Sequence, residues 1–434
     1  MAAPMEAARR DELKAEKWDL IPFAEAGRRL NEAVENEIST TDLVAIIFSA
    51  ATSLRASDVH LESGKNDALL RLRLDGLLYD VARLPRGVYD DVLGRIKLIA
   101  GLKLNVVDVP QDGRFTIIRD GDEIEVRAST VPSEYGETAV LRLLDPKAVA
   151  LDLEDLGLRA DDLDIADKEL KKPNGMVLVA GPTGSGKTTT LYAFLKKVHT
   201  SELKTITIED PIEYHLSGIE QTQVDPKAGY DFASGLRSIL RQDPDIILVG
   251  EIRDLETAEV AMHAALTGHV VFSTLHTNDA AGAVPRLVDL GTKPAIIGPA
   301  INLIVAQRLV RRLCEYCKTE TPMSPGLAEN IKKLMTKLPK RVDKTNVKPK
   351  IYSARGCDKC HNGYRGRVGV FELLEVDDAL ENLIAEEVTE ETIREFARKQ
   401  GMIEMQTDGI LKVFSGVTTL DEVERVTGPL KWPR

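Results

Sequence analysis

The residues with the clearest chemical potential are those of one loop, Gly181–Thr188, which fits the pattern GxxxxGK[ST]. The apolar segment Met176–Ala180 before it is predicted to be a buried strand, and Thr188–Val198 after it has the composition and spacing of a helix. An ordinary glycine-rich turn fits this context poorly. Between a strand and a helix N-terminus, such a loop turns successive backbone N–H groups toward phosphate oxygens.

Two side chains of this loop can bind a nucleoside triphosphate and its metal ion. Lys187 can neutralise charge on the β- and γ-phosphates, and Thr188 can ligate Mg²⁺. The sequence therefore predicts a nucleotide site whose contacts come from Gly181, Pro182, Thr183, Gly184, Ser185, Gly186, Lys187, Thr188 and Thr189.

Carboxylates follow the loop at the ends of two further predicted strands. Glu209, Asp210 and Glu213 come after Thr205–Ile208, and Glu251 comes after Ile246–Val249. In open α/β sheets, ligands bind beyond the carboxyl ends of the strands. We therefore expect Glu209 to align or deprotonate water and Glu251 to hold the Mg²⁺ shell or the attacking water. A solvent-exposed acidic loop is the alternative for the first group, and a strand followed by one acid is common by chance.

Histidines and arginines follow with weaker signals. His269 and His276 flank the predicted strand Val270–Leu275, where uncharged imidazoles near a γ-phosphate could report its presence, although structural histidines explain them equally well. Arg237 and Arg241 are four residues apart, so on one helix face their charges repel. We expect an anion between them, either phosphate or one of the carboxylates named above, with a solvated helix face as the alternative.

A strand pattern places one more arginine. Leu70, Leu72 and Leu74 alternate with Arg71, Arg73 and Asp75, which is the two-residue period of a strand with one polar face. That face is usually the wet side of an antiparallel sheet. The same geometry would let Arg73 enter a nucleotide site on a neighbouring domain or subunit.

The four cysteines form two CxxC pairs, Cys314 with Cys317 and Cys357 with Cys360, and 39 residues separate the pairs. Two such turns that converge offer four thiolates for a structural Zn²⁺ with no ligand position open to water. Two reduced surface pairs or a redox-active CxxC are the alternatives.

Composition limits the class of protein. A chain of 434 residues predicts two or three domains, and a formal net charge of −12 argues against nucleic acid as the main ligand. The longest apolar run, Pro294–Ala306, falls short of the ~18 residues that span a bilayer. The opening residues lack the apolar core of a signal peptide, and thiolate pairs suit a reducing compartment, so we expect a cytoplasmic protein whose membrane contact is peripheral.

The pattern along the chain predicts an α/β protein with a second, smaller domain. Residues 1–40 are expected to be an arm, either a loosely attached helix or disordered, residues 41–150 a small α+β domain, and residues 151–174 an acidic linker. Residues 175–434 alternate strands and helices, as in a parallel sheet covered on both faces. Within them we expect a zinc-binding subdomain at 313–365 and a helical tail at 375–434.

Taken together and in order, the motifs of residues 41–428 resemble those of the GspE/PilB family of type II secretion and type IV pilus assembly ATPases. The matching segments are GPTGSGKTTT, TIEDPIEY, LRSILRQDPDIILVGEIRD, TGHVVFSTLHTNDA, the cysteine pairs, ASDVHLE, RLRLDG, PQDGRF and GRVGVFELL. The resemblance implies a RecA-like P-loop NTPase domain with Gly181–Thr188 as Walker A. It also implies catalytic roles for Glu209 as general base, Glu251 in Walker B, His269 and His276 in the His box, and Arg73, Arg237 and Arg241 as arginines that sense or complete the site.

The resemblance further implies a homohexameric motor that uses ATP, Mg²⁺ and Zn²⁺ to drive pilin or pseudopilin assembly or protein secretion. Such a motor acts on an inner-membrane platform protein and lies peripherally at the cytoplasmic face, with no nucleic acid expected. The cysteine pairs favour the assembly or secretion branch over the retraction branch. Asp108 stands where relatives usually have a basic residue before PQDGR, so no arginine role is carried over there. A conjugation-type secretion ATPase and a nucleotide-gated scaffold with little turnover are the alternatives.

Overall fold

The computed structural model describes residues 13–15, 21–145, 151–343, 350–386 and 389–432. The chain forms two compact units. The first contains Met1–Ala148, Cys314–Cys317 and Arg355–Arg365, and the second contains Val149–Leu313, Lys318–Ala354 and Gly366–Arg434.

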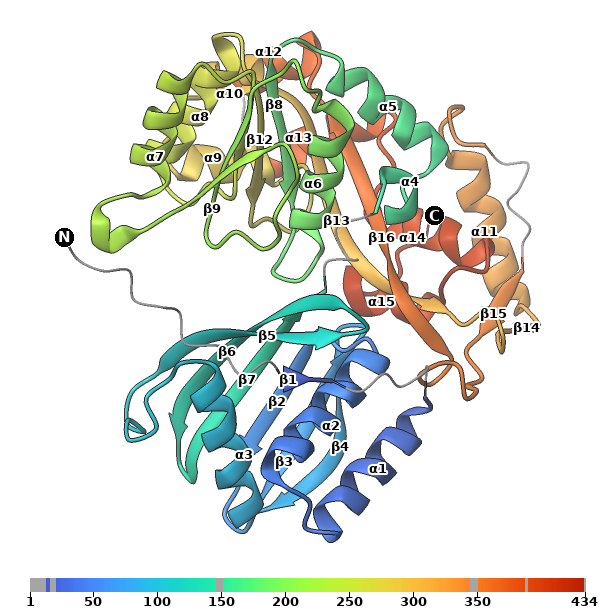
Figure 1. Ribbon diagram of the computed structural model, residues 1–434. Helices are drawn as coiled ribbons and strands as arrows, with labels where there is room; N and C mark the ends of the chain where they lie inside the picture. Colours follow the sequence, from blue (N-terminus) through green and yellow to red (C-terminus); the bar gives the residue numbers. More distant parts are fainter. Residues whose placement is uncertain (1–12, 16–20, 146–150, 344–349, 387–388, 433–434) are drawn as a thin grey trace, which may run out of the picture. The chain divides into compact units, whose positions relative to one another are not determined.

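The first unit is built on a seven-stranded sheet in the order β1-β5-β6-β7-β2-β3-β4 (Figure 1). All pairs are antiparallel except β1 with β5. Helices α1, α2 and α3 supply the other half of its apolar core. The elements are β1 (Leu13–Lys14), α1 (Phe23–Glu35), α2 (Thr40–Ser53), β2 (Asp58–Ser63), β3 (Asp67–Leu74), β4 (Leu77–Pro85), α3 (Arg86–Ile99), β5 (Gln111–Arg119), β6 (Asp122–Ser133) and β7 (Gly136–Leu144).

Strand β3 has the two faces that its alternating sequence predicts. Leu70, Leu72 and Leu74 are buried in the core of the first unit. Arg71 and Arg73 occupy the intervening positions and are partly exposed. Leucine burial therefore fixes the register of this strand and the direction in which Arg73 points.

Helix α1 differs from the expectation of a weakly packed arm before residue 41. Its Ala26, Leu30 and Ala33 are buried in the same core as α2 and the sheet. The helix is otherwise rich in charge, and Arg28 forms ion pairs with Glu25 and Glu32 along its outer face. Three small or medium apolar residues at helical spacing are enough to anchor this helix, and the charge around them hides the pattern.

The second unit is built on a seven-stranded sheet in the order β10-β9-β11-β12-β8-β13-β16 (Figure 1). The pairs from β10 through β13 are parallel, as the alternation of strands and helices predicts. The strands of this sheet are β8 (Gly175–Ala180), β9 (Thr205–Glu209), β10 (Glu220–Gln223), β11 (Ile246–Val249), β12 (Val270–Leu275), β13 (Ile301–Leu313) and β16 (Tyr364–Glu375).

Helices cover both faces of this sheet. Alternate residues of β8 face opposite cores: Met176 and Leu178 lie in one, and Val177 and Val179 in the other. The first face is covered by α7 (Phe232–Ile239), α8 (Leu255–Leu266), α9 (Ala283–Asp289), α10 (Pro294–Ala300), α12 (Asp378–Glu386) and α13 (Glu390–Gln400). The second is covered by α4 (Leu153–Leu156), α5 (Ala160–Leu170) and α6 (Lys187–Val198).

The short helices η2 (Pro226–Ala228) and η3 (Leu240–Gln242) precede and follow α7. The remaining elements of this unit form a smaller packed group: the paired strands β14 (Thr319–Thr321) and β15 (Ile351–Ser353), and helices α11 (Pro325–Lys337), α14 (Met405–Phe414) and α15 (Leu420–Thr427). Ile331 and Leu334 of α11 pack against Ile410 and Val413 of α14. Among the described residues, no helix is long and apolar enough to cross a membrane.

The acidic segment expected to be an irregular linker is instead part of the second unit. Its helices α4 and α5 bury Leu153, Leu156, Ala166 and Leu170 against the sheet. The acidic residues that suggest a linker in the sequence partly serve a buried ion cluster. Arg159 donates to Asp162 and to Asp408, with N–O distances of 2.7 and 2.6 Å.

Asp408 is the centre of that cluster. Its side chain is fully buried in α14 and accepts hydrogen bonds from Arg159, from Lys412 and from the backbone N–H of Phe371 in β16. A buried carboxylate between two cations is stable only while all three groups remain together. Asp408 therefore ties the α14 helix to the sheet and to the start of α5.

Asp408→Ala should destabilise the protein by about 3–5 kcal/mol, because it leaves two cations buried without their shared anion. The measurement is the midpoint of chemical or thermal denaturation. Glu395→Ala is the matched control, since Glu395 is exposed on α13 and its loss should leave the midpoint nearly unchanged. Equal midpoints for the two variants would contradict this role of Asp408.

Candidate nucleotide-binding site

The loop from Gly181 to Gly186 follows β8 directly and leads into α6. Gly181, Gly184 and Gly186 have φ angles of +155°, +77° and +90°. A Cβ at Gly181 would lie 2.5 Å from Ser185 Oγ and 2.8 Å from the carbonyl oxygen of Gln307, so this position requires glycine. Strand, loop and helix are therefore arranged as the sequence predicts.

The loop residues differ in exposure. Pro182, Thr183 and Gly184 are exposed, Ser185 is buried, and Gly186, Lys187, Thr188 and Thr189 are half-buried. Within the described part of the chain, Ser185 Oγ and Gln307 Oε1 are buried without a hydrogen-bond partner. Because buried polar atoms normally have partners, these two atoms mark a place where a polar ligand fits.

Lys187 at present bonds to its own loop. Its ammonium donates to the carbonyl oxygens of Gly181 at 2.9 Å and Pro182 at 3.1 Å. Burial lowers the pKa of Lys187, and the nearby charge of Arg308 lowers it further, while Glu251 acts in the opposite direction. An amine held in this way is ready to exchange two neutral carbonyls for an anion.

Glu251 lies at the same edge of the sheet, two residues beyond β11. Its carboxylate forms an ion pair with Arg253 at 2.6 Å, and one carboxylate oxygen lies 3.3 Å from Nε2 of His276. Burial and the charge of Lys187 lower the pKa of His276, so its imidazole is neutral at neutral pH. Lys187, Glu251 and His276 are therefore brought together, as the order of motifs predicts.

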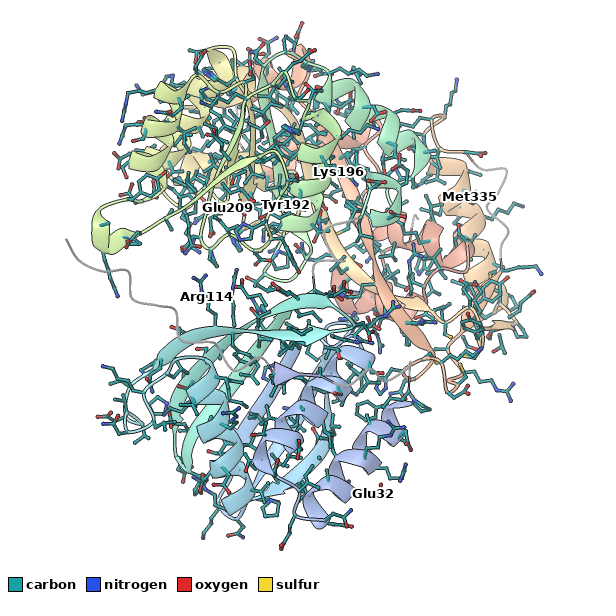
Figure 2. All side chains as sticks on the ribbon, viewed as in Figure 1. Glu32, Arg114, Tyr192, Lys196, Glu209 and Met335 are labelled. Atoms are coloured by element: carbon teal, nitrogen blue, oxygen red, sulfur yellow. The ribbon has the colours of Figure 1, made fainter. Side chains whose placement is uncertain are left out.

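Of the three acids at the end of β9 and in the loop after it, only Glu209, the last residue of the strand, is buried, with 3% of its surface exposed. It accepts hydrogen bonds from Thr207 Oγ1 at 2.6 Å, from Gln221 Nε2 at 3.0 Å and from the hydroxyl of Tyr192. Figure 2 shows Glu209 beside Tyr192. Asp210 is exposed and Glu213 half-buried in the loop that follows. The alternative prediction of a solvent-exposed acidic loop is therefore correct for Asp210 and wrong for Glu209.

His269 is placed at the other end of β12. It precedes the strand that His276 follows, so seven steps of about 3.3 Å put them ~23 Å apart along the strand. Its Nδ1 lies 3.0 Å from the carbonyl oxygen of Ala264. His269 therefore fits the structural role that was the alternative for it, and the structure does not place His269 near the phosphate loop.

The predicted arginines also have partners away from the loop. Arg237 pairs with Glu256 at 2.5 Å, and Arg241 donates to the carbonyl oxygen of Arg237 at 2.9 Å and to Ser238. The partner of Arg237 is a carboxylate, but it is not one of those expected to lie between the two arginines. Arg73 belongs to the first unit, where it pairs with Asp58 at 3.2 Å.

Sequence reasoning missed two residues on β13. Gln307 donates to the carbonyl oxygen of Ser185 at 2.6 Å, which fixes the loop, and Arg308 donates to the carbonyl oxygen of Asn278 at 2.9 Å. Both follow the apolar run Pro294–Ala306 without a break. A polar pair directly after a long apolar run is the signal that could have found them.

Glu372, within GRVGVFELL, was missed as well. It is almost fully buried in β16 and accepts from the backbone N–H of Ala280 at 2.6 Å and of Met405 at 3.1 Å. Burial raises its pKa to about 7, although both N–H groups act against that shift. Glu372 thus holds the segment that follows His276 against the start of α14.

The four cysteine sulfurs form one cluster. Every pair of Sγ atoms lies within 4.8 Å, and three of the pairs are 3.6, 3.7 and 3.9 Å apart. Four sulfurs ~2.3 Å from a tetrahedral zinc ion lie ~3.8 Å from one another, whereas a disulfide requires ~2.05 Å. The cluster therefore has the geometry of a four-thiolate metal site.

The structure groups the cysteine turns with the first unit rather than with the domain of residues 175–434. In that unit, the ring of His361 packs against Phe23 of α1 and Tyr79 of β4, at centroid distances of 4.6 and 3.9 Å. The long segment between the cysteine pairs supplies β14, α11 and β15, which belong to the second unit. That packing explains the unusual spacing of the pairs.

A parallel sheet that carries a GxxxxGK[ST] loop at the carboxyl end of one strand and acids at the ends of its neighbours defines a P-loop ATPase. A family model described as Type II/IV secretion system protein matches residues 33–425. The chain therefore belongs to the family of type II and type IV secretion system ATPases.

Curated relatives agree with this family. Type II secretion system ATPase E of Vibrio cholerae is 44% identical over 421 residues, covering 96% of this chain and 81% of the relative. Type II secretion system protein E of Pseudomonas aeruginosa is 45% identical over 394 residues, covering 91% and 76%. Type IV pilus assembly ATPase PilB of Thermus thermophilus is 44% identical over 390 residues, covering 89% and 43%.

Solved structures confirm the fold class. The pilus retraction motor PilT with bound ADP superimposes with a TM-score of 0.57 at 27% identity, covering 88% of this chain and 95% of PilT. The ATPase DotB of Legionella pneumophila has a TM-score of 0.62 at 22% identity, covering 88% and 94%. The predicted RecA-like ATPase domain, preceded by a smaller α+β domain, is thus confirmed.

The cysteine cluster predicts about one zinc ion per chain in protein purified without chelator. Cys357→Ser should reduce that content, because three thiolates complete the tetrahedron poorly. Elemental analysis of the purified protein measures both values. Less than about half an equivalent of zinc in the unmodified protein would contradict a zinc site.

Proposed function

We propose that this chain is one subunit of a homohexameric motor that hydrolyses ATP to drive a type IV pilus or type II secretion machine. The observation that carries the proposal is the gathering of Lys187, Glu251 and His276 at one edge of a parallel sheet. Relatives named Type II secretion system ATPase E and type IV pilus assembly ATPase PilB support the kind of machine.

In the proposed site, the backbone of Gly181–Gly186 and the ammonium of Lys187 hold the phosphates. Thr188 would ligate Mg²⁺, which supplies positive charge to the β- and γ-phosphate oxygens when bound. Glu251 would hold the metal's water shell, and Glu209 would orient or deprotonate the attacking water. His276, which is neutral and close to Lys187, would donate a hydrogen bond that reports the γ-phosphate.

The remaining proposed roles require assembly. Arg73, Arg237 and Arg241 would complete a site between subunits, and His269 would act only indirectly, from the far edge of the sheet. The cysteine cluster would hold a structural Zn²⁺. An inner-membrane platform protein would receive the motion at the cytoplasmic face, and no nucleic acid would be needed.

Two other functions are less well supported. Curated relatives at 44–45% identity are named as type II secretion and pilus assembly ATPases, which disfavours a conjugation-type ATPase. A nucleotide-gated scaffold with little turnover has no need of the paired, partly buried carboxylate at position 251.

Glu251→Gln should abolish ATP hydrolysis while leaving ATP affinity within about two-fold, because the loop that binds phosphate is unchanged and only the carboxylate charge is lost. Turnover assays and binding of a fluorescent ATP analogue measure the two quantities. Glu202→Gln is the control, since Glu202 is exposed in the turn before β9, far from the strand's carboxyl end. Hydrolysis by Glu251→Gln at the parent rate would refute the proposed site.

Arg73→Ala should lower turnover at least about ten-fold with unchanged KM for ATP, because an arginine that completes a neighbouring site acts on the transition state. Arg83→Ala is the matched control, since Arg83 lies on the adjacent strand β4 and pairs with the exposed Asp67. Steady-state kinetics at a protein concentration that supports the full oligomer distinguish the two. Unchanged kinetics for Arg73→Ala would mean that Arg73 only faces solvent on its sheet and completes no nucleotide site.

A further inference from the structure

The carboxylate of Glu209 has an unusually complete set of donors. A carboxylate has about four lone-pair directions on its two oxygens. Oε1 of Glu209 accepts from Thr207 and from Gln221, and Oε2 accepts from Tyr192. One direction, on Oε2, is therefore left for a further donor such as a water molecule.

Each of these donors comes from a different element. Thr207 is two residues before Glu209 on β9, so both side chains lie on the same face of that strand. Gln221 is the β10 residue paired with Thr207. Tyr192 lies on α6, five residues after Lys187. The donors therefore connect Glu209 to the helix that begins at the phosphate loop.

The orientation of Gln221 is set by its surroundings. Its Oε1 accepts from the backbone N–H of Leu216 at 2.7 Å, and its Nε2 donates to the carbonyl oxygen of Tyr214 at 3.0 Å. The amide nitrogen must then face Glu209. If the amide were reversed, its oxygen would face the acceptor oxygens of Glu209 and Tyr214, and its nitrogen would face the N–H donor of Leu216. Gln221 is a fixed donor to Oε1.

The hydroxyl of Tyr192 is also confined to donating. Burial raises the pKa of Tyr192, and the negative charge of Glu209 raises it further, so the hydroxyl keeps its proton. The charges that act on Tyr192 are those of Glu209 and of Glu213 in the loop after β9, whereas Thr207 and Gln221 are neutral. Tyr192 therefore donates to Oε2 throughout the physiological pH range.

We propose that Tyr192 is a positioning residue for hydrolysis, which fixes Oε2 of Glu209 so that its one remaining lone pair points to the attacking water. This inference rests on the proposed role of Glu209 in orienting or deprotonating water. Loss of the hydroxyl would free Oε2 to rotate and would leave the buried charge with two donors instead of three. Water would then be aligned less often, although the phosphates would be held as before.

The test is a kinetic comparison of Tyr192→Phe with Tyr230→Phe in the full-length protein. The control removes a hydroxyl that lies 3.0 Å from Thr222 Oγ1, a residue of the same strand as Gln221, without touching Glu209. Tyr192→Phe should lower kcat about ten-fold or more while KM for ATP stays within about two-fold, because a positioned acid–base group contributes ~10²–10⁴-fold. Tyr230→Phe should keep the parent values.

The separation of kcat from KM distinguishes positioning from a loss of packing, because a packing defect in the helix that begins at the phosphate loop would also raise KM for ATP. Thr207→Val, which removes a donor to Oε1 at nearly constant volume, should likewise lower kcat with little change in KM. This second variant also provides the test if Tyr192→Phe folds poorly.

A Glu209→Gln variant makes the two possible failures distinguishable. Parent-rate hydrolysis by Glu209→Gln would refute the proposed role of Glu209 itself. Loss of hydrolysis in Glu209→Gln, combined with parent kcat and KM in Tyr192→Phe, would overturn the role of Tyr192 and leave the proposed function intact. If both roles hold, Tyr192→Phe should have no further effect in the Glu209→Gln background.

Discussion

Charge neutralisation at the carboxyl edge of the parallel sheet is the constraint on which the rest of this site depends. The sheet brings a lysine and several carboxylates to one place because parallel strands end at the same edge. Half-buried charges without partners would be costly there. The chain supplies internal partners: Lys187 donates to carbonyls of its own loop, Glu251 pairs with Arg253, and Glu209 accepts from its own set of donors. In the proposed function, binding of a nucleotide would therefore be an exchange of partners.

The surrounding architecture keeps that edge in place. Gln307 fixes the phosphate loop, and Glu372 ties the segment after His276 to the start of α14. Asp408 in turn ties α14 to β16 and to the start of α5. These contacts connect the nucleotide edge to the C-terminal helices through backbone N–H groups and buried ions, which hold directions more strictly than apolar packing does.

Local signals in the sequence predicted most of the nucleotide edge. The strand, loop and helix around Gly181–Thr188 follow from glycines, apolar runs and helix formers that act within a few residues, and the strands before Glu209 and Glu251 are short apolar runs of the same kind. The alternating leucines of β3 likewise set its buried face. Where a local residue pattern determines a single strand, loop or helix, the sequence was sufficient to predict that element.

Features that depend on distant contacts could not be predicted in this way. The helix α1 and the acidic segment that contains α5 look unstructured by composition, yet each buries a few apolar residues against partners far along the chain. The cysteine turns group with the first unit although the sequence on either side belongs to the second. The two histidines that flank β12 look equivalent in the sequence, and only the direction of the strand separates His276 at the nucleotide edge from His269 at the other.

The most direct test of the exchange of partners is an experimental structure of the protein with Mg²⁺ and a non-hydrolysable ATP analogue. The account predicts phosphates in the loop Gly181–Thr188, with the ammonium of Lys187 moved from the carbonyl oxygens of Gly181 and Pro182 to the β- and γ-phosphate oxygens. A nucleotide bound elsewhere, or a Lys187 that keeps both carbonyl contacts while the nucleotide occupies the loop, would contradict it.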